Sequence, residues 1–158
     1  TLLEIIAGIR RPSSGKVVYQ QNGTMIASNI EHLLGFASPR LHFYDELTAH
    51  ETIKFIAKDV AAVERGFLLL ERFALTKQHI LQIGQFSTGM VQRLKIIAAL
   101  INDPPVLLLD EPCSNLDDTG RRAVFSIIEE SIPQKTIIIA TNDKEEASLC
   151  SGRISLGA

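Results

Sequence analysis

The sequence predicts an α/β fold with a mostly parallel sheet, and three observations lead to this prediction. Two short apolar runs, residues 106–109 and 136–140, have the length of strands that are buried on both faces of a sheet. Amphipathic stretches of helical length separate and follow these runs. Strands that alternate with helices favour a parallel sheet with right-handed crossovers. The 158 residues are enough for one domain with a substantial core.

Composition excludes several classes of protein. With 46% hydrophobic and 22% charged residues the sequence is that of an ordinary globular protein, which excludes disordered and low-complexity chains. The formal net charge of −2 gives no basic surface, so we expect no nucleic-acid partner. Two cysteines, Cys113 and Cys150, are too few for a disulfide framework, and we expect reduced thiols. No apolar run approaches the roughly 18 residues of a membrane-spanning helix.

The N-terminal part of the chain is predicted to form a helix, a hairpin and a strand. Residues 1–7 are apolar at helical spacing and end at Gly8, which favours a helix stop. Residues 16–21 are expected to form a strand that turns at Asn22-Gly23, a dipeptide typical of hairpins. Residues 33–37 are a short apolar run that we interpret as the next strand.

Further helices are predicted where apolar residues recur three and four positions apart. The first begins with a capping box, in which Thr48 is followed three residues later by Glu51. A last short strand is expected at residues 153–156. The predicted helices cover residues 48–58, 60–73, 88–101, 118–130 and 144–149.

The middle of the chain contains predicted helices and no convincing strand. We therefore interpret residues 39–95, with approximate limits, as a helical subdomain. It is inserted into one α/β core formed by residues 1–38 and 96–158. The sequence shows no internal repeat.

Two consecutive carboxylates, Asp110 and Glu111, follow the apolar run at residues 106–109. Open α/β sheets bind ligands at the carboxyl ends of their strands. There Asp110 suits Mg²⁺, which keeps part of its water shell, and Glu111 suits activation of a water aimed at a γ-phosphate. A bare pair of acids could equally cap a turn and stay solvated. The buried strand before the pair and Pro112 after it favour phosphate chemistry.

Residues 87–93 stand immediately before a long predicted helix. Ser87 and Gly89 are residue types that let a hydroxyl and backbone N–H groups approach a phosphate at a helix N-terminus. Taken alone, this pattern is also that of a simple N-cap with a glycine nearby. Only one helix separates it from Asp110 and Glu111, and this arrangement favours a phosphate site.

These motifs resemble those of the ATP-binding domain of ABC transporters. Residues 87–93 resemble the signature of that family in its Ser-x-Gly-Met form. Residues 107–112 resemble the Walker B motif with the catalytic glutamate, and residues 114–117 resemble the D-loop. The resemblance covers nearly the whole chain. It implies a P-loop NTPase core, RecA-like in type, with the helical insertion of ABC proteins.

The resemblance also implies ATP and Mg²⁺ as cofactors and assigns a role to particular residues. Asp110 would hold Mg²⁺, and Glu111 and Asn142 would be catalytic. Asn142 stands where the family has its switch histidine, and it can donate a hydrogen bond but cannot take up a further proton or carry a positive charge. The residues implied to contact the nucleotide are Thr1, Ser87, Thr88, Gly89, Met90 and Asp117.

A second departure from the family is Pro39, which stands where the Q-loop glutamine is expected. Proline offers neither a side-chain amide nor an N–H, and Ser38 could replace the glutamine in part. Together with Asn142, this change implies slower hydrolysis or a mechanism that depends on Glu111 alone. A variant subfamily with normal transport fits the sequence equally well.

The resemblance implies two partners. A second ATP-binding domain would face the first head to tail, so that Ser87, Thr88 and Gly89 touch the nucleotide bound by the other domain. A membrane-spanning transporter subunit would contact residues 39–48, which places the chain peripherally at the cytoplasmic side of the membrane. Two alternatives stay open: a soluble ABC-type ATPase acting on ribosomes or DNA, and a degenerate, non-catalytic ABC subunit.

The phosphate-binding loop of the family, G-x-x-x-x-G-K-[ST], does not occur in the 158 residues. Gly15-Lys16 does not qualify, because Val17 follows the lysine and Arg10 stands where the first glycine belongs. We expect the loop and the N-terminal strands to precede Thr1. Thr1 could instead cap a helix by itself, since Glu4 follows at capping-box spacing.

We therefore predict that the chain of residues 1–158 by itself binds ATP poorly, because that loop supplies most of the phosphate affinity in P-loop proteins. Isothermal titration with ATP and Mg²⁺ measures this directly. Weak or undetectable binding is expected. A dissociation constant in the micromolar range would contradict the prediction.

Overall fold

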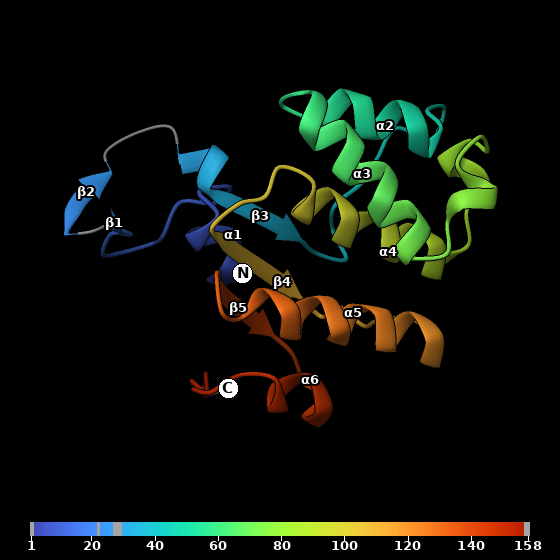
Figure 1. The fold of residues 1–158 in the computed structure, drawn as a ribbon. Helices are drawn as coiled ribbons and strands as arrows, with labels where there is room; N and C mark the ends of the chain where they lie inside the picture. The colour runs from blue at the N-terminus through green and yellow to red at the C-terminus, as the bar shows by residue number, and fades with distance from the viewer. Residues whose placement is uncertain (1, 22, 27–29, 157–158) are drawn as a thin grey trace.

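The computed structural model describes residues 2–21, 23–26 and 30–156 of the chain. Its centre is a three-stranded sheet in which all neighbouring strands run parallel (Figure 1). The strands are β3 (Leu34–Ala37), β4 (Val106–Asp110) and β5 (Thr136–Ala140), in that spatial order. The α/β class and the parallel sheet predicted from the sequence are confirmed.

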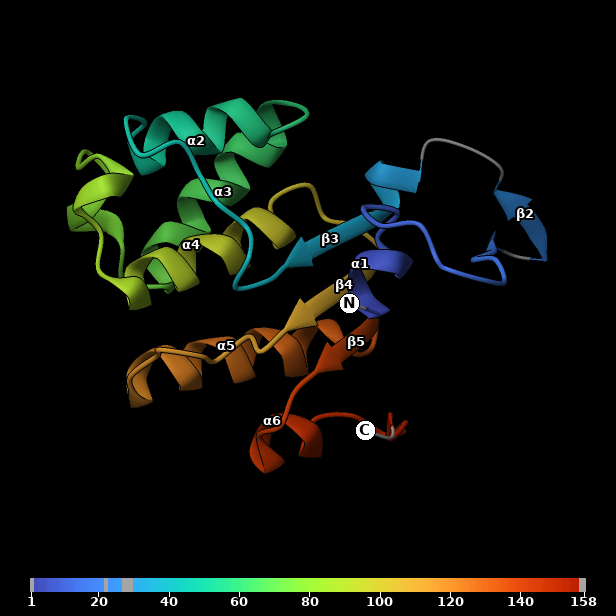
Figure 2. The same cartoon turned by 180° about the vertical axis from the view of Figure 1, so that it is seen from behind.

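Helical segments connect the strands of this sheet, as parallel strands require. Helix α4 packs against β3, and α1 contacts β4. The C-terminal helices α5 and α6 lie on the β5 side of the molecule, away from α2 and α3 (Figures 1 and 2). The helices are α1 (Leu2–Ile6), α2 (Ala49–Ile56), α3 (Val60–Arg72), α4 (Thr88–Leu100), α5 (Asp118–Ser131) and α6 (Lys144–Ser148), with 3₁₀ turns at Ile30–Leu33, Thr76–Gln78 and Ile83–Gln85.

Helices α2 to α6 begin where the sequence supplies a side-chain cap. The capping box predicted at the start of α2 is present: the Glu51 N–H donates to Thr48 Oγ1 at 3.1 Å, and the Thr48 N–H donates to Glu51 Oε2 at 2.8 Å. A cap of this kind contributes about 1 kcal/mol. Four later helices are capped by one side chain each, namely Asp59, Ser87, Asp117 and Asp143.

A two-stranded antiparallel hairpin stands apart from the main sheet (Figure 1). It pairs β1 (Tyr19–Gln21) with β2 (Thr24–Ile26), which confirms the hairpin predicted from the sequence. The first strand is shorter than expected, because residues 16–18 are exposed and are not part of a strand. Asn22 of the predicted turn lies outside the described residues, and Gly23 has the positive φ of +77° that such a turn favours.

The strand expected at residues 153–156 is wrong. This segment has no regular secondary structure, and Ile154 and Leu156 are 85% and 71% exposed. A strand needs a neighbour for its hydrogen bonds, and within the described part of the chain no strand pairs with this segment. Ile138 on β5 is 36% exposed.

One continuous cluster of buried apolar side chains runs from the helices at residues 49–100 into the sheet. Leucines 107, 108 and 109 of β4 are at most 1% exposed, as expected for a central strand covered on both faces. The division at residues 38 and 95 stays a prediction, since residue 95 lies inside α4 and both parts share this core. Other fully buried members are Ile53, Phe73, Leu75, Leu94, Ile97, Ile101 and Val124.

The contact between β3 and α4 depends on Gly35. A Cβ atom at this position would lie 2.0 Å from the Ala99 carbonyl oxygen and 2.8 Å from Pro104 Cγ. Because backbone atoms cannot move aside as a side chain can, α4 would have to leave the sheet. We predict that Gly35→Ala lowers the free energy of unfolding by about 3 kcal/mol.

Urea unfolding of the protein carrying Gly35→Ala measures this loss. Gly152→Ala is the matched control, because no atom lies within 4 Å of the Cβ position there and Gly152 does not have a positive φ. The control should unfold at the wild-type urea concentration. A Gly35→Ala protein as stable as the control would show that the packing of α4 on β3 is not as close as described.

Candidate functional site

The candidate site lies at the carboxyl end of β4. Asp110 is the last residue of this strand, and Glu111 follows at once with a φ of +46°. This left-handed conformation costs a residue with a side chain about 1–2 kcal/mol. Neighbouring groups hold it in place: the Glu111 N–H donates to the Ala140 carbonyl on β5 at 2.8 Å, and its own carbonyl accepts from the Ser114 N–H at 3.1 Å.

Ser38 contacts Asp110 directly. The parallel register pairs Ala37 with Leu109, so the residues that follow these two meet at the same edge of the sheet. There the buried Ser38 hydroxyl donates to Asp110 Oδ2 at 3.1 Å. From the sequence, Ser38 could replace the missing glutamine in part, and its hydroxyl is in contact with the predicted metal ligand.

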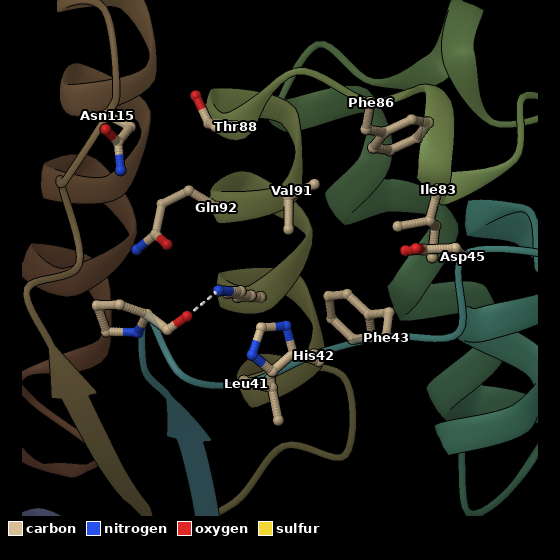
Figure 3. A pocket seen from close by; sticks show the side chains of 12 residues that line it. Leu41, His42, Phe43, Asp45, Ile83, Phe86, Thr88, Val91, Gln92 and Asn115 are labelled. Carbon is tan, nitrogen blue, oxygen red and sulfur yellow. Dashed lines mark hydrogen bonds between the residues drawn. The ribbon is translucent and has the colours of Figure 1, made fainter.

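Pro39 is exposed beside this contact, and its carbonyl accepts a hydrogen bond from Lys95 Nζ at 2.7 Å. The bond is the dashed line in the close view of Figure 3. Lys95 is only 6% exposed, and burial lowers the pKa of its ammonium group. The loop after β3 is thus fixed by a side chain from α4.

Glu111 and Asn142 line the same cavity, which has a volume of about 210 Å³. Both side chains are exposed to solvent. Asn142 lies in the short turn between β5 and α6, where the Asp143 N–H donates to Thr141 Oγ1 at 2.9 Å. Arg121 of α5 also lines the cavity. The structure therefore brings the two residues predicted to be catalytic together, beside Asp110.

Arg121 links α5 to this turn. Its guanidinium lies 2.9 Å from Asp143 Oδ2 and 2.9 Å from Glu145 Oε2. These hydrogen bonds, led by the one to Asp143, raise the pKa of Arg121, and in return Arg121 lowers the pKa of Asp143. The residue before α6 is Asp143, which caps the helix. Arg121 thus helps to fix the turn that carries Asn142.

The predicted nucleotide contacts at residues 87–90 form the beginning of α4. Ser87 caps the helix by accepting from the Met90 N–H at 3.2 Å, so the simple capping role considered for it is present. Ser87 and Thr88 are exposed, whereas Gly89 and Met90 are half-buried. Gly89 allows a close approach, because a Cβ there would lie 2.9 Å from the Asn115 carbonyl oxygen.

A second cavity of about 340 Å³ lies between α4 and the loop after β3. Figure 3 shows Thr88 and Gln92 projecting from α4 toward the side on which Asn115 lies. Asp117, in contrast, uses one carboxylate oxygen as the cap of α5, accepting from the Gly120 N–H at 2.8 Å. Thr1 lies outside the described residues.

Several residues at the site were not singled out as functional from the sequence. Gln92, Lys95 and Glu146 are polar, and yet they are 3%, 6% and 2% exposed. Gln92 belongs to the quoted signature segment, which was the one available signal. Lys95 and Glu146 stand in helical segments where a sequence pattern does not separate a buried polar group from a solvated one.

Within the described residues, no group of three or more His, Cys, Asp and Glu side chains is arranged to hold a metal ion. None of the described helices is both long and apolar enough to cross a membrane.

Comparison with known proteins decides the family. The family model described as ABC transporter matches residues 1–114, which is more than two thirds of the chain. The chain belongs to the ABC transporter family. Lipoprotein-releasing system ATP-binding protein LolD of Protochlamydia amoebophila is 30% identical to this chain over an alignment of 170 positions. The alignment covers 99% of this chain and 74% of LolD.

Solved structures of ABC proteins share the fold. A structure of an ATP-binding subunit of an ABC transporter matches with a TM-score of 0.78 and 25% identity, over 92% of this chain and 64% of that one. MJ0796, a bacterial ABC transporter cassette solved as a dimer, matches with a TM-score of 0.79 and 22% identity, over 94% and 71%. MJ0796 has also been solved in a post-hydrolysis state bound to ADP and Pi. The P-loop NTPase fold of the ABC type is confirmed.

Cys113 of this ABC chain lies in the wall of the cavity that contains Glu111, and we expect its thiol to be unreactive in the folded protein. It is 3% exposed, and burial, together with the negative charge of Glu146, raises the pKa of the thiol to about 12. Compared with an ordinary value of 9.0, this lowers the fraction of reactive thiolate at pH 8 by about 1,000-fold.

We predict that the folded protein shows no fast reaction of Cys113 with a thiol reagent such as Ellman's reagent at pH 8. The half-buried Cys150 should react first, and Cys113 should follow only on unfolding. Cys113→Ser and Cys150→Ser proteins assign the two signals. Rapid labelling of Cys113 in the folded Cys150→Ser protein would contradict the buried, protonated thiol.

Proposed function

We propose that the chain is part of the ATP-hydrolysing subunit of an ABC transporter. The single observation that supports this most strongly is the cavity at the carboxyl end of β4, which Glu111 and Asn142 share next to Asp110. The exposed carboxylate of Glu111 and the exposed amide of Asn142, beside the end of a buried strand, suit the hydrolysis of a phosphate. The carboxylate accepts a proton from a water, and the amide donates a hydrogen bond to a phosphate oxygen.

Asp110 is proposed to hold Mg²⁺ together with Ser38. The carboxylate of Asp110 and the hydroxyl of Ser38, 3.1 Å apart, are the oxygen donors that Mg²⁺ accepts. Mg²⁺ keeps several waters and would take its remaining ligands from phosphate. When bound, Mg²⁺ would neutralise part of the phosphate charge.

Glu111 is proposed as the general base. Its backbone is fixed on both sides, whereas its side chain is exposed in the cavity. Asn142 would contact the γ-phosphate as a neutral hydrogen-bond donor, so it would stabilise the developing negative charge less than a protonated histidine could. We therefore expect slower turnover than in the same protein with histidine at position 142.

The intact protein is proposed to work as a dimer with a membrane-spanning partner. Ser87, Thr88, Gly89, Met90 and Asp117 would face the nucleotide held by the second ATP-binding domain. The N-terminus of α4 begins at the exposed residues Ser87 and Thr88, and the N-terminus of a helix suits a phosphate. MJ0796, with the same fold, is known as a dimer. Thr1 would contact the nucleotide held by its own domain, and residues 39–95 would form the subdomain that meets the membrane partner.

Glu111→Gln in the full-length protein tests the proposed function. The amide keeps the shape of the side chain but cannot accept the proton, so we predict a loss of ATP turnover of about 10²–10⁴-fold. ATP binding should be retained, and ATP should accumulate on the protein in a filter or gel-filtration assay.

Glu129→Gln is the matched control. Glu129 is exposed near the C-terminal end of α5, whereas the cavity is lined by Arg121 near the N-terminal end of that helix. It should hydrolyse ATP at the wild-type rate. If Glu111→Gln leaves a measurable wild-type turnover unchanged, Glu111 is not the general base. If the wild-type full-length protein hydrolyses no ATP, the non-catalytic interpretation of the sequence is the correct one.

A further inference from the structure

The turn at residues 111–115, which follows β4, is fixed by a buried side chain from α4. Gln92 is 3% exposed, and its Nε2 donates to the Glu111 carbonyl at 3.3 Å and to the Pro112 carbonyl at 3.0 Å. An amide nitrogen carries two hydrogens, so this one group satisfies two consecutive carbonyls. Both carbonyls belong to the turn that carries the proposed general base.

The same turn is fixed from its other side by α6. Glu146 is 2% exposed, and its Oε1 accepts from the Cys113 N–H at 2.9 Å. Glu146 lies four residues after Asn142 and lines the cavity that contains Glu111. The turn therefore lies between one side chain from the signature helix and one from the helix that follows the switch position.

The turn needs such support because its backbone is strained. Glu111 and Asn115 have φ angles of +46° and +59°. Each such residue costs about 1–2 kcal/mol and persists only where the surroundings determine its conformation. Asparagine tolerates this region better than most residues, whereas glutamate does not. The conformation of Glu111 is thus maintained by its neighbours and not by its own preference.

We propose that Gln92 is a positioning residue for ATP hydrolysis: it holds the backbone of Glu111 so that the carboxylate points at the reacting water. This inference rests on the proposed function. Gln92 touches neither nucleotide nor water in this role, and acts through the Glu111 and Pro112 carbonyls. A displacement of about 1 Å of a catalytic group can cost about 10²-fold in rate.

The position of Gln92 has a second consequence. Gln92 is five residues after Ser87, on one continuous helix, and Gly89 of the same helix lies against the Asn115 carbonyl. A shift of the exposed helix start would therefore move the turn that carries Glu111. In the proposed dimer, the start of α4 touches the nucleotide of the other domain, so Gln92 couples that contact to the hydrolysis carried out by its own domain.

Gln92→Met in the full-length protein tests this inference. Methionine has a similar length and volume but donates no hydrogen bond. We expect kcat for ATP to fall about 10–100-fold while KM for ATP stays within about twofold of the wild type, since the nucleotide contacts are unchanged. Hydrogen–deuterium exchange at residues 111–116 should become at least about tenfold faster. Gln134→Met, at an exposed turn after α5, is the control and should change neither.

The outcomes separate this inference from the proposed function. Wild-type kcat and unchanged exchange in the Gln92→Met protein would overturn the positioning role and leave the ATPase assignment intact. If the wild-type protein hydrolyses no ATP, the proposed function fails and with it the positioning role of Gln92. Should Gln92→Met not fold, exchange in the wild-type protein decides: rapid exchange of the Cys113 and Ser114 amides would show that the turn is not held.

Discussion

The site depends on the burial of β4 at the centre of the sheet. Leu107, Leu108 and Leu109 are almost fully buried, so a shift of this strand by one residue would bring Asp110 into the core and expose a leucine. A buried, unpaired carboxylate costs far more than the few kcal/mol that keep a domain folded. The apolar run therefore fixes where the strand ends and, with it, where Asp110 and Glu111 stand.

The parallel register converts this one constraint into a site. Because β3 and β5 run in the same direction as β4, their carboxyl ends meet its end at one edge, where Ser38, Asp110 and the turn before α6 come together. Residues 72 positions apart in the sequence, Ser38 and Asp110, are thereby brought within hydrogen-bond distance. No local preference of either residue could produce this contact.

Sequence reasoning succeeded where a local signal was decisive. The strand at residues 34–37, the capping box at Thr48 and the order of helices and strands all follow from patterns that span a few residues. It failed at residues 153–156, because a short segment becomes a strand only when another strand lies beside it. It also did not assign roles to Gln92 and Glu146, since their partners are carbonyl and N–H groups of a distant turn, which carry no sequence signal.

The charges at the site limit how a triphosphate can be held. Glu111, Asp143 and Glu146 line the smaller cavity, and its one guanidinium, Arg121, is already paired with Asp143 and Glu145. Lys95, in the larger cavity, is buried and donates to the Pro39 carbonyl. Both cations are thus committed to the protein itself. Under the proposed function, neutralisation of the phosphates would fall to Mg²⁺ at Asp110, to the phosphate-binding loop that the family uses, and to the helix N-terminus of a second domain. The proposed site would then be competent only when these parts assemble, which would connect the hydrolysis step to the closure of the proposed dimer.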